Sequence, residues 1–454
     1  MKVLFFNPAR SGQGFIPLNI PLLISVARKR HEVRLFDLSD YATFDTINKS
    51  YEKMFFKEAT FDENLIIKDR GKFYEDKFGL TVKDLDLKHS DYEEDFEDLI
   101  IQFNPDLIAV SSLSVDFSFA RDFLRKFKKK YQIPIILGGI HAILMPEEVI
   151  SSDVFDMVCI GEGENSLENL LDALEKKQSL MEVKGIWFKD NGTVVKTGPI
   201  ALTDINNLPL SDYDLFDPIH FYRPYDGKRY KMLNYELSRG CPFNCTYCVN
   251  GVLKRKYRGL GRYHRIKDPA RAVQELESLI HKYNFNFIRF WDEDFTSIPI
   301  KILKSFRKLY LRKISLPFLI YARVTSINEE KVRIFKDMGC RGFAMGIESG
   351  NEFIRKKVMN RKMSNKEIIE KFQLVKSYNI RTSAYNIIGV PYETRETIFD
   401  TIELNRTINP DSFSVTMLEP YKGTPIRKVC EEQGLDPDHE TVFCKPQFFA
   451  FYIS

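Results

Sequence analysis

Three cysteines lie within eight residues of the stretch Ser238-Arg-Gly-Cys241-Pro-Phe-Asn-Cys245-Thr-Tyr-Cys248. Their C-x3-C-x2-C spacing lets one tight loop offer three thiolates to a single inorganic cluster. On a four-iron cluster, three protein ligands leave one iron open for a small molecule. A structural zinc ion would need a fourth cysteine or histidine nearby, and the next candidates, His264 and Cys340, stand far along the chain. The loop therefore indicates an iron–sulfur cluster, with a zinc site or buried structural cysteines as the alternatives.

The composition of the chain limits what else it can be. It has 454 residues, 44% hydrophobic and 29% charged, with a net charge of +4. At roughly 100–200 residues per domain, this length predicts several domains with substantial cores. The charge balance argues against a disordered chain and against a strongly basic nucleic-acid surface. No stretch is apolar enough to span a membrane, and the first residues become polar too quickly for a signal peptide. The cysteines are too few for a disulfide scaffold. We therefore expect a cytoplasmic protein.

The first 180 residues predict a Rossmann-like α/β domain. Short apolar runs alternate with helical stretches, and the runs lie at 3–6, 33–38, 107–112, 133–137 and 157–160. This alternation is typical of a doubly wound parallel sheet with helices on both faces. The charged and aromatic stretch 41–98 is long for one crossover, so we expect a helical insertion there.

Ligands of such sheets bind in the crevice beyond the carboxyl ends of the strands. The candidate residues at these ends are Ser111, Ser112, Leu113, Gly138, Gly139, His141, Glu162 and Gly163. Small residues at several strand ends allow the tail of a large cofactor to approach the backbone. The alternative is that the glycines only make the turns, and their spacing does not distinguish the two.

The second half of the chain repeats strands and helices in a different order. A hairpin with an Asn191-Gly192 turn and a proline-rich linker fill residues 181–230. Six strand candidates follow with helices between them, and they lie at 233–237, 287–291, 318–321, 342–347, 382–388 and 412–418. Polar residues follow several of these strands, among them the acidic run Asp292-Glu293-Asp294.

The cysteine loop and the βα units that follow it resemble the radical S-adenosylmethionine (SAM) superfamily. The resemblance implies a partial (βα)6 barrel over 231–430, with active groups at the carboxyl ends of its strands, and a C-terminal extension over 431–454. It also implies that Cys241, Cys245 and Cys248 hold a 4Fe-4S cluster whose open iron chelates SAM.

The same resemblance implies a set of contacts to SAM. The methionyl ammonium would be received by Glu293, chosen from the three acidic residues after the second strand, and the carboxylate by Arg323. Tyr247 would lie along the adenine, Glu348 would reach the ribose hydroxyls, and Gly389 would let the backbone approach the adenine. The alternative for Arg323 and Glu348 is a simple ion pair at the barrel mouth. No catalytic residue that acts on the substrate is predicted.

Both halves together resemble the radical SAM enzymes that carry an N-terminal cobalamin-binding domain. The phrases that carry this resemblance include Ser111-Ser-Leu113, Leu137-Gly-Gly-Ile-His141, Gly161-Glu-Gly-Glu164, Gly346-Ile-Glu-Ser-Gly350 and Ile388-Gly-Val-Pro-Tyr-Glu393. The resemblance implies that the strand-end residues of the first domain bind cobalamin. Residues 7–20 contain none of the histidines that many cobalamin proteins use as the lower cobalt ligand. This class commonly lacks that histidine, so the lower face is left to water, another side chain or nothing.

The resemblance predicts a cobalamin-dependent methyltransferase that methylates an unactivated carbon of a small-molecule or lipid substrate through a 5′-deoxyadenosyl radical. A basic loop at 254–265 could grip a phosphate or carboxylate of that substrate, or could simply be solvated. The reaction needs an electron donor such as flavodoxin or ferredoxin, and no nucleic acid. The alternatives are a non-methylating radical reaction, such as cyclisation or carbon–carbon bond formation, and a sensor without catalysis. The full set of SAM-binding phrases argues against a sensor.

Overall fold

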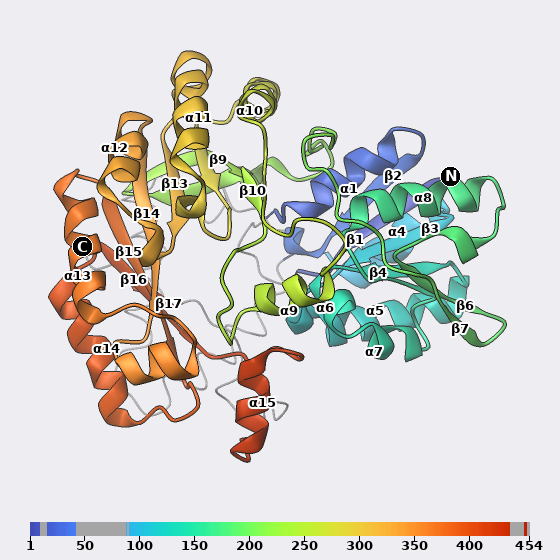
Figure 1. Ribbon diagram of the computed structural model, residues 1–454. Coiled ribbons are helices and arrows are strands. Elements are labelled where there is room, and N and C mark those ends of the chain that lie inside the picture. Colours follow the sequence, from blue (N-terminus) through green and yellow to red (C-terminus); the bar gives the residue numbers. More distant parts are fainter. Residues whose placement is uncertain (10–15, 42–87, 89, 436–448, 452–454) are drawn as a thin grey trace. The chain divides into compact units, whose positions relative to one another are not determined.

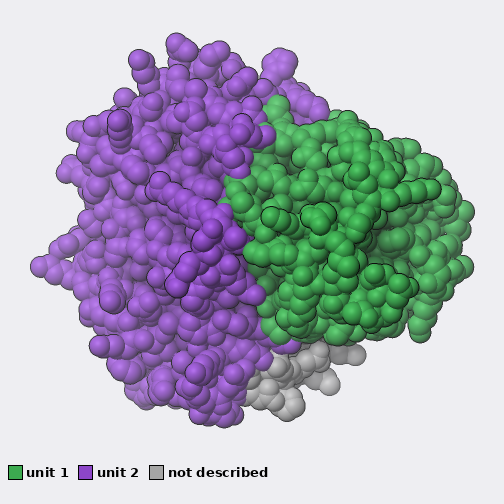
Figure 2. Space-filling view, turned by 45° about the vertical axis from the view of Figure 1, so that its right-hand side comes forward, with its two compact units in different colours: residues 1–203, 208–232 green, residues 204–207, 233–454 purple. Residues whose placement is uncertain are grey.

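The computed structural model describes residues 1–9, 16–41, 88, 90–435 and 449–451. The chain divides into two compact units, the first made of residues 1–203 and 208–232 and the second of residues 204–207 and 233–454 (Figure 2). None of the described helices has the length and apolar character needed to cross a membrane.

The first unit is built on a seven-stranded sheet with the order β2-β1-β3-β4-β5-β6-β7 (Figure 1). The strands are β1 (Lys2–Asn7), β2 (Glu32–Asp37), β3 (Leu107–Ser111), β4 (Ile135–Gly138), β5 (Met157–Cys159), β6 (Ile186–Asp190) and β7 (Thr193–Lys196). The helices are α1 (Asn19–Arg28), α4 (Tyr92–Phe103), α5 (Ser114–Tyr131), α6 (Ile140–Leu144), α7 (Pro146–Ser151) and α8 (Gly163–Glu175). β1 to β5 pair in parallel, and Figure 1 shows α1 and α8 on one side of them and α5 and α7 on the other. The predicted Rossmann-like sheet is confirmed.

The centre of this sheet is apolar because helices cover both of its faces. In β1 every residue from Val3 to Phe6 is at most 3% exposed, as expected of a strand without a solvent face. Phe6 lies 5.5 Å from Phe96 of α4 and 5.1 Å from Phe123 of α5, measured between ring centroids. These aromatic contacts fix the helices on the sheet and so fix the loops at its carboxyl edge.

Two segments around this sheet bear on the sequence predictions. The helical insertion expected over about 41–98 lies largely outside the described residues, and its last part, from Tyr92, is the start of α4. β6 and β7 form the expected hairpin around Asn191-Gly192. β6 also pairs antiparallel with β5, so the hairpin continues the sheet of the first unit.

A second sheet has the order β17-β16-β15-β14-β13-β12-β9-β8 and is built mainly from the second unit, while its residues 222–232 belong to the first unit. Its strands are β8 (Tyr222–Tyr225), β9 (Lys228–Tyr235), β12 (Phe287–Phe290), β13 (Phe318–Ala322), β14 (Cys340–Glu348), β15 (Arg381–Ile388), β16 (Ser412–Met417) and β17 (Phe449–Phe451), with β10 (Ser238–Arg239) and β11 (Arg265–Ile266) as a separate pair. The helices are α9 (Val249–Lys256), α10 (Pro269–Tyr283), α11 (Ile300–Lys313), α12 (Glu329–Asp337), α13 (Asn365–Ser377), α14 (Arg395–Ile408) and α15 (Pro425–Glu432).

This sheet is the partial barrel that the resemblance implies. β12 to β16 pair in parallel, each with the next along the chain, and Figure 1 shows α11, α12, α13 and α14 along the outer side of these strands. A parallel βα series of this kind places the carboxyl ends of all its strands at the same edge of the sheet. β17 pairs antiparallel with β16, so part of the expected C-terminal extension adds an edge strand.

Candidate active site

The cysteine loop joins β10 to α9 at the carboxyl edge of the second sheet. Cys248 is the residue that caps the N-terminus of α9, so the last cysteine stands at the positive end of that helix. The loop is fastened from within: Nζ of Lys254, the first basic residue of the 254–265 stretch, donates to the carbonyl oxygen of Pro242 at 2.7 Å. Lys254 thus supports the loop in the structure.

The three cysteine sulfurs are not gathered closely enough to bind a single metal ion together. Cys241, Cys245 and Cys248 are free thiols, and Cys245 is buried. Among the described residues, their sulfurs belong to no set of three candidate ligand atoms that all lie within 4.8 Å of one another. A tetrahedral zinc ion with bonds of about 2.3 Å would hold its sulfurs about 4 Å apart. The zinc alternative therefore finds no support in this part of the chain.

Burial makes the thiols of Cys241 and Cys248 reluctant to ionise by themselves. It raises the pKa of Cys241 to about 12 and that of Cys248 to about 11, and the carboxylate of Glu293 adds to the effect. A thiolate ligand here needs positive charge nearby, which bound iron would provide. Protein cations contribute as well, because Nη1 of Arg323 donates to Sγ of Cys245 at 3.2 Å.

Two of the three acidic residues after β12 are occupied by the fold. Asp292 accepts from the backbone N–H groups of Leu237 and Ser238, and burial raises its pKa to about 7. Asp294 accepts from the backbone N–H of Arg323 at 3.1 Å and from other groups of the following turn. Both carboxylates therefore connect neighbouring strand ends and are poorly placed to receive a ligand.

Glu293 is the carboxylate of this run that faces the cysteine loop. Its Oε2 accepts from Nδ2 of Asn250 at 2.8 Å, and the same Nδ2 lies 3.5 Å from Sγ of Cys248. Burial raises the pKa of Glu293. Asn250, which in turn accepts from the hydroxyl of Tyr263 at 2.6 Å, was missed by the sequence analysis, since a single asparagine in a helix carries no signal.

Glu348 ends β14 in a backbone conformation that costs energy. Its φ is +68°, a region that residues other than glycine avoid and that clusters at functional sites. The hydroxyl of Tyr247 donates to Oε1 of Glu348 at 2.9 Å, and the guanidinium of Arg361 lies 3.4 Å from the same oxygen. The structure thus brings Tyr247 and Glu348 together and adds Arg361, which no sequence pattern singled out.

Arg323 does not form the ion pair with Glu348 that was the alternative for these two residues. Its guanidinium lies 4.0 Å over the ring of Phe243 and points to Cys245, while Glu348 is paired with Arg361. Both Arg323 and Glu348 are 8% exposed. Arg323 therefore contacts Cys245, while Glu348 contacts Tyr247 and Arg361.

Gly389 is the last of the residues that are predicted to contact SAM. It follows β15 with φ +78°, and its N–H donates to Oε2 of Glu393 at 2.6 Å. A Cβ at this position would come within 2.9 Å of the terminal methyl of Met417. The backbone conformation and the packing against Met417 therefore both favour a glycine at position 389.

The first unit gathers its candidate residues at the carboxyl ends of β3 and β4. Nδ2 of Asn19 donates to Oγ of Ser111 at 2.6 Å, and the N–H of Ser112 donates to the carbonyl oxygen of Gly138 at 3.1 Å. Leu113 follows and is 55% exposed. The edge is thus small, polar and partly open, which fits a large polar cofactor.

Local structure explains the identity of two residues at this edge, Gly139 and His141. Gly139 has φ +91°, and a Cβ there would lie 2.7 Å from the carbonyl oxygen of Ser112. His141 is buried, stacks on Phe117 at 3.9 Å between ring centroids, and bonds Oγ of Ser114 through Nδ1 at 3.2 Å. The backbone conformation at Gly139 therefore favours a glycine by itself, and His141 is part of the packing beneath the edge.

Glu162 and Gly163 lie at the start of α8. Oε2 of Glu162 accepts from the backbone N–H of Thr203 at 2.8 Å, so this carboxylate fastens the segment that follows the hairpin. A Cβ on Gly163 would come within 3.2 Å of Leu23 in α1. This glycine allows close packing of α8 against α1.

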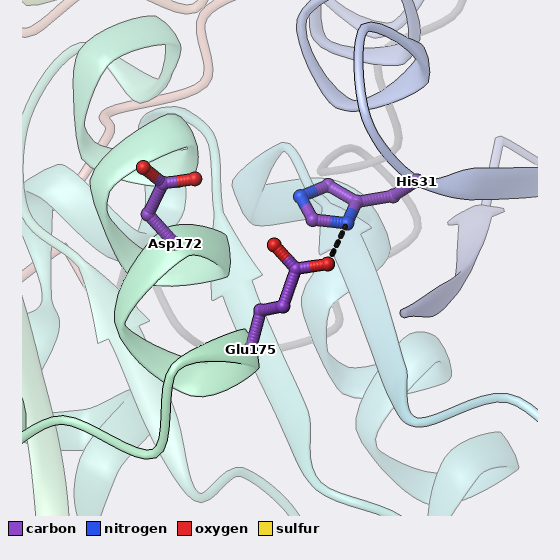
Figure 3. Close-up of side chains that lie close together, drawn as sticks. All are labelled: His31, Asp172 and Glu175. Atoms are coloured by element: carbon purple, nitrogen blue, oxygen red, sulfur yellow. Dashed lines mark ion pairs between the residues drawn. The ribbon is translucent and has the colours of Figure 1, made fainter.

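Another group of titratable side chains in this unit is explained by ion pairing. His31 lies beside Asp172 and Glu175, with Nδ1 3.8 Å from Oε1 of Glu175 (Figure 3). Arg30 pairs with both carboxylates, at 2.6 Å and 3.0 Å, and Lys176 pairs with Asp172 at 3.2 Å. These cations neutralise the carboxylates, so the group ties α8 to the start of β2 and needs no metal ion.

Comparison with known proteins identifies domains in both units. Residues 235–404 match the family model of the radical SAM superfamily, and residues 71–171 match that of the B12 binding domain. An uncharacterized methyltransferase of Pyrococcus horikoshii is 28% identical over 340 residues, which cover 73% of this chain and 71% of that protein. The anaerobic magnesium-protoporphyrin IX monomethyl ester cyclase of Cereibacter sphaeroides is 26% identical over 343 residues, which cover 73% of this chain and 54% of the cyclase.

Solved structures share the fold. The radical SAM methyltransferase TsrM of Kitasatospora setae, with cobalamin and a 4Fe-4S cluster bound, matches with a TM-score of 0.68 and 17% identity, covering 95% of this chain and 75% of TsrM. The cobalamin-dependent radical enzyme OxsB, with aqua-cobalamin and SAM bound, matches with a TM-score of 0.62 and 16% identity, covering 96% of this chain and 56% of OxsB.

Proposed function

Because this chain belongs to the radical SAM superfamily and carries a B12-binding domain, we propose that it is a cobalamin-dependent methyltransferase acting on an unactivated carbon of a small-molecule or lipid substrate. The observation that carries the proposal is the presence in one chain of a three-cysteine loop, a set of polar groups at the barrel edge, and a sheet edge fit for cobalamin. Relatives named as methyltransferases, including the one from Pyrococcus horikoshii, support it.

In this proposal Cys241, Cys245 and Cys248 hold the cluster, and the groups around them bind SAM. When bound, the cluster supplies the electron that cleaves SAM, and cobalamin supplies a carrier for the methyl group. Glu293 receives the methionyl ammonium, because it is the carboxylate after β12 that is turned to the cysteine loop. Arg323, beside Cys245, receives the carboxylate.

The nucleoside of SAM is held by groups on β14, β15 and the cysteine loop. Glu348 accepts hydrogen bonds from the ribose hydroxyls, and Tyr247 lies along the adenine. The two side chains already hydrogen-bond each other, so they form one surface. Gly389 lets the backbone approach the adenine, since it carries no side chain.

The cobalamin tail is held at the edge formed by Ser111, Ser112 and Gly138, with Leu113, Gly139, His141, Glu162 and Gly163 around it. Ser111 and Ser112 offer hydroxyl groups, and Gly138 leaves space. His141 shapes this edge by packing on Phe117. Residues 7–20 hold no histidine, so this loop would offer no imidazole to a bound cobalamin.

A second function, a radical cyclisation without methyl transfer, is favoured by the cyclase relatives. The chain spans only about half the length of the Cereibacter sphaeroides cyclase. In either case the enzyme acts on a substrate and draws electrons from a reductant, for which we propose a flavodoxin or a ferredoxin.

The two functions differ in what they make from SAM. With cobalamin and reductant, the reconstituted methyltransferase should convert SAM into both S-adenosylhomocysteine and 5′-deoxyadenosine, and the first should require cobalamin. Liquid chromatography with mass spectrometry measures both products. Formation of 5′-deoxyadenosine alone, with and without cobalamin, would contradict methyl transfer and favour the cyclisation.

The assignment of Glu348 predicts a loss of SAM affinity without loss of the cluster. Glu348→Gln removes a charged acceptor, and a charge-assisted hydrogen bond contributes about 1.5–3 kcal/mol, so the Kd for SAM should rise roughly ten- to hundredfold. Arg323→Ala should have a similar effect. Equilibrium dialysis of SAM against protein of known iron content measures it.

A matched control for this substitution is Glu352→Gln. Glu352 lies on the same connection after β14, its side chain is 40% exposed, and it pairs with Lys356. It should leave SAM affinity unchanged. Equal Kd values for wild type and Glu348→Gln, together with a lower Tm of the variant, would show that Glu348 is only structural.

A further inference from the structure

We propose that Arg361 is a positioning residue of the SAM site, which aligns Glu348 and Tyr247 and places a second positive charge beside the cluster ligand Cys245. This inference rests on the proposed function, because it requires the cluster and SAM to bind at the carboxyl edge of the barrel. The evidence for this inference is the set of contacts that the guanidinium of Arg361 makes.

The guanidinium of Arg361 is buried and touches three residues of the site. Nη1 donates to the hydroxyl oxygen of Tyr247 at 3.1 Å, and it lies 3.4 Å from Oε1 of Glu348 and 3.8 Å from Sγ of Cys245. Nη2 donates to the carbonyl oxygen of Gly346 at 2.5 Å. Because Tyr247 also donates to Glu348, the three side chains form a closed network. Such a buried network holds each of its members in one orientation.

One donor of this guanidinium is left over. Nε of Arg361 is buried and has no hydrogen-bond partner within the described ranges of the chain. Buried side-chain donors nearly always have a partner, so an acceptor is expected from a bound molecule. The neighbouring carboxylate of Glu348 is the group assigned to the ribose. The leftover donor therefore favours an oxygen or nitrogen of the SAM nucleoside as its partner.

Two guanidinium groups approach the same cysteine sulfur. Nη1 of Arg323 is 3.2 Å and Nη1 of Arg361 is 3.8 Å from Sγ of Cys245. Hydrogen bonds and positive charge at a ligand sulfur favour the reduced, more negative form of a cluster and so raise its reduction potential. Arg361 therefore makes it easier for the external reductant to deliver the electron that SAM cleavage consumes.

The backbone next to Arg361 is tied to the cysteine loop. The carbonyl oxygen of Met359 accepts from the backbone N–H of Thr246 at 3.1 Å, and that of Val358 accepts from Oγ1 of Thr246 at 2.7 Å. Thr246 is the direct neighbour of Cys245. These hydrogen bonds fix the position of the backbone near Arg361 relative to the cysteine loop.

A second buried arginine nearby provides a matched control. Arg355 is fully buried on the same connection between β14 and α13, but it donates to the carbonyl oxygens of Ser349 and Met363. Its other partners are Asn365, which accepts from Nη2 at 2.6 Å, and Glu352, and neither is assigned to the cluster or to SAM. Arg355→Gln therefore removes a comparable guanidinium from the fold and leaves the site groups in place.

The experiment compares Arg361→Gln, Arg361→Lys and Arg355→Gln in the full chain after anaerobic reconstitution. Iron content, the Kd for SAM and the midpoint potential of the cluster, from an EPR-monitored redox titration, are measured for each. Arg361→Gln should keep its iron, bind SAM roughly ten- to hundredfold more weakly, and show a more negative potential. A tenfold change in the redox equilibrium corresponds to about 59 mV for one electron.

The two other variants separate position from charge. Arg361→Lys keeps the charge, so its potential should stay near that of the wild type. Its single ammonium cannot bridge Glu348, Tyr247 and Gly346, so its SAM affinity should still fall. Arg355→Gln should lower the Tm and leave both the SAM affinity and the potential unchanged.

The proposal is overturned if Arg361→Gln matches the wild type in SAM affinity and potential, or if Arg355→Gln shifts both as strongly. Should Arg361→Gln fail to fold, Arg361→Lys decides, and an unchanged SAM affinity in that variant rejects the positioning role. A wild-type chain that takes up neither iron nor SAM contradicts the proposed function instead. The two failures are therefore distinguishable.

Discussion

Replacing Cys241, Cys245 or Cys248 by alanine should abolish the cleavage of SAM. Each cysteine is one of three ligands, and with two thiolates left the loop cannot hold a four-iron cluster with one open iron. Without the cluster no electron reaches SAM, so 5′-deoxyadenosine formation should fall to the background of the assay. Product analysis after anaerobic reconstitution with a strong chemical reductant measures this loss.

Cysteines outside the loop provide the control for this result. Cys159 and Cys340 are both buried, and each donates to a backbone carbonyl oxygen two residues on, of Gly161 and Gly342 respectively. Alanine at these positions removes a thiol of the core and should leave the iron content and SAM cleavage intact. Full iron content in the triple alanine variant of the loop would reject the cluster assignment.

Gly138→Leu should block the uptake of cobalamin and leave the cluster untouched. Gly138 ends β4, and a Cβ there would meet only ordinary contacts, 3.7 Å from Cβ of Cys159 and 3.8 Å from the carbonyl oxygen of Val110. The fold therefore accepts a side chain, but a leucine would extend into the space assigned to the cofactor tail. S-adenosylhomocysteine formation should cease while 5′-deoxyadenosine still forms. Cobalt and iron analysis of the same sample gives the first measurement.

Gly138→Ala is the matched control, because it adds the Cβ without filling the crevice. It should fold normally and take up more cobalamin than Gly138→Leu. Gly139 is unsuitable for the same test, since its positive φ and its contact with Ser112 make any side chain strained. Equal cobalt content in wild type and Gly138→Leu would remove Gly138 from the cobalamin site.

The sequence predicted well those features that depend on order along the chain. The cysteine spacing is local, and the strands appear as short apolar runs because covered strands need no polar face. Residues that directly follow a strand must lie at the carboxyl edge of a parallel sheet. This is why the sequence alone could place Glu293, Arg323, Glu348 and Gly389 at one edge of the barrel.

Partners of side chains could not be predicted in the same way. Glu348 pairs with Arg361, although Arg323 also lies at the barrel edge, because the choice depends on distances across the fold. The neighbours of Glu293 are likewise engaged by backbone groups of other strands, such as the N–H of Leu237 with Asp292. Sequence spacing contains none of these distances.

In the first unit the sequence predicted which residues lie at the carboxyl edge of the sheet, where we propose that cobalamin binds, while the role of each residue depends on packing. His141 was selected as a cobalamin residue from a family phrase, and the structure shows it stacked on Phe117 and bonded to Ser114. Glu162 was selected likewise, and its carboxylate holds Thr203. Residues that shape a binding edge and residues that touch the ligand look alike in a sequence.

Cofactor content tests the central claim most directly, because the claim is that one chain holds both an iron–sulfur cluster and cobalamin. The full chain is reconstituted anaerobically with iron, sulfide and cobalamin under reducing conditions, desalted, and analysed for iron, sulfide and cobalt. The account predicts about four irons per chain and bound cobalt in the same molecule. A chain that takes up iron and cleaves SAM but never retains cobalt would contradict the account, and the first unit would then serve a radical enzyme that transfers no methyl group.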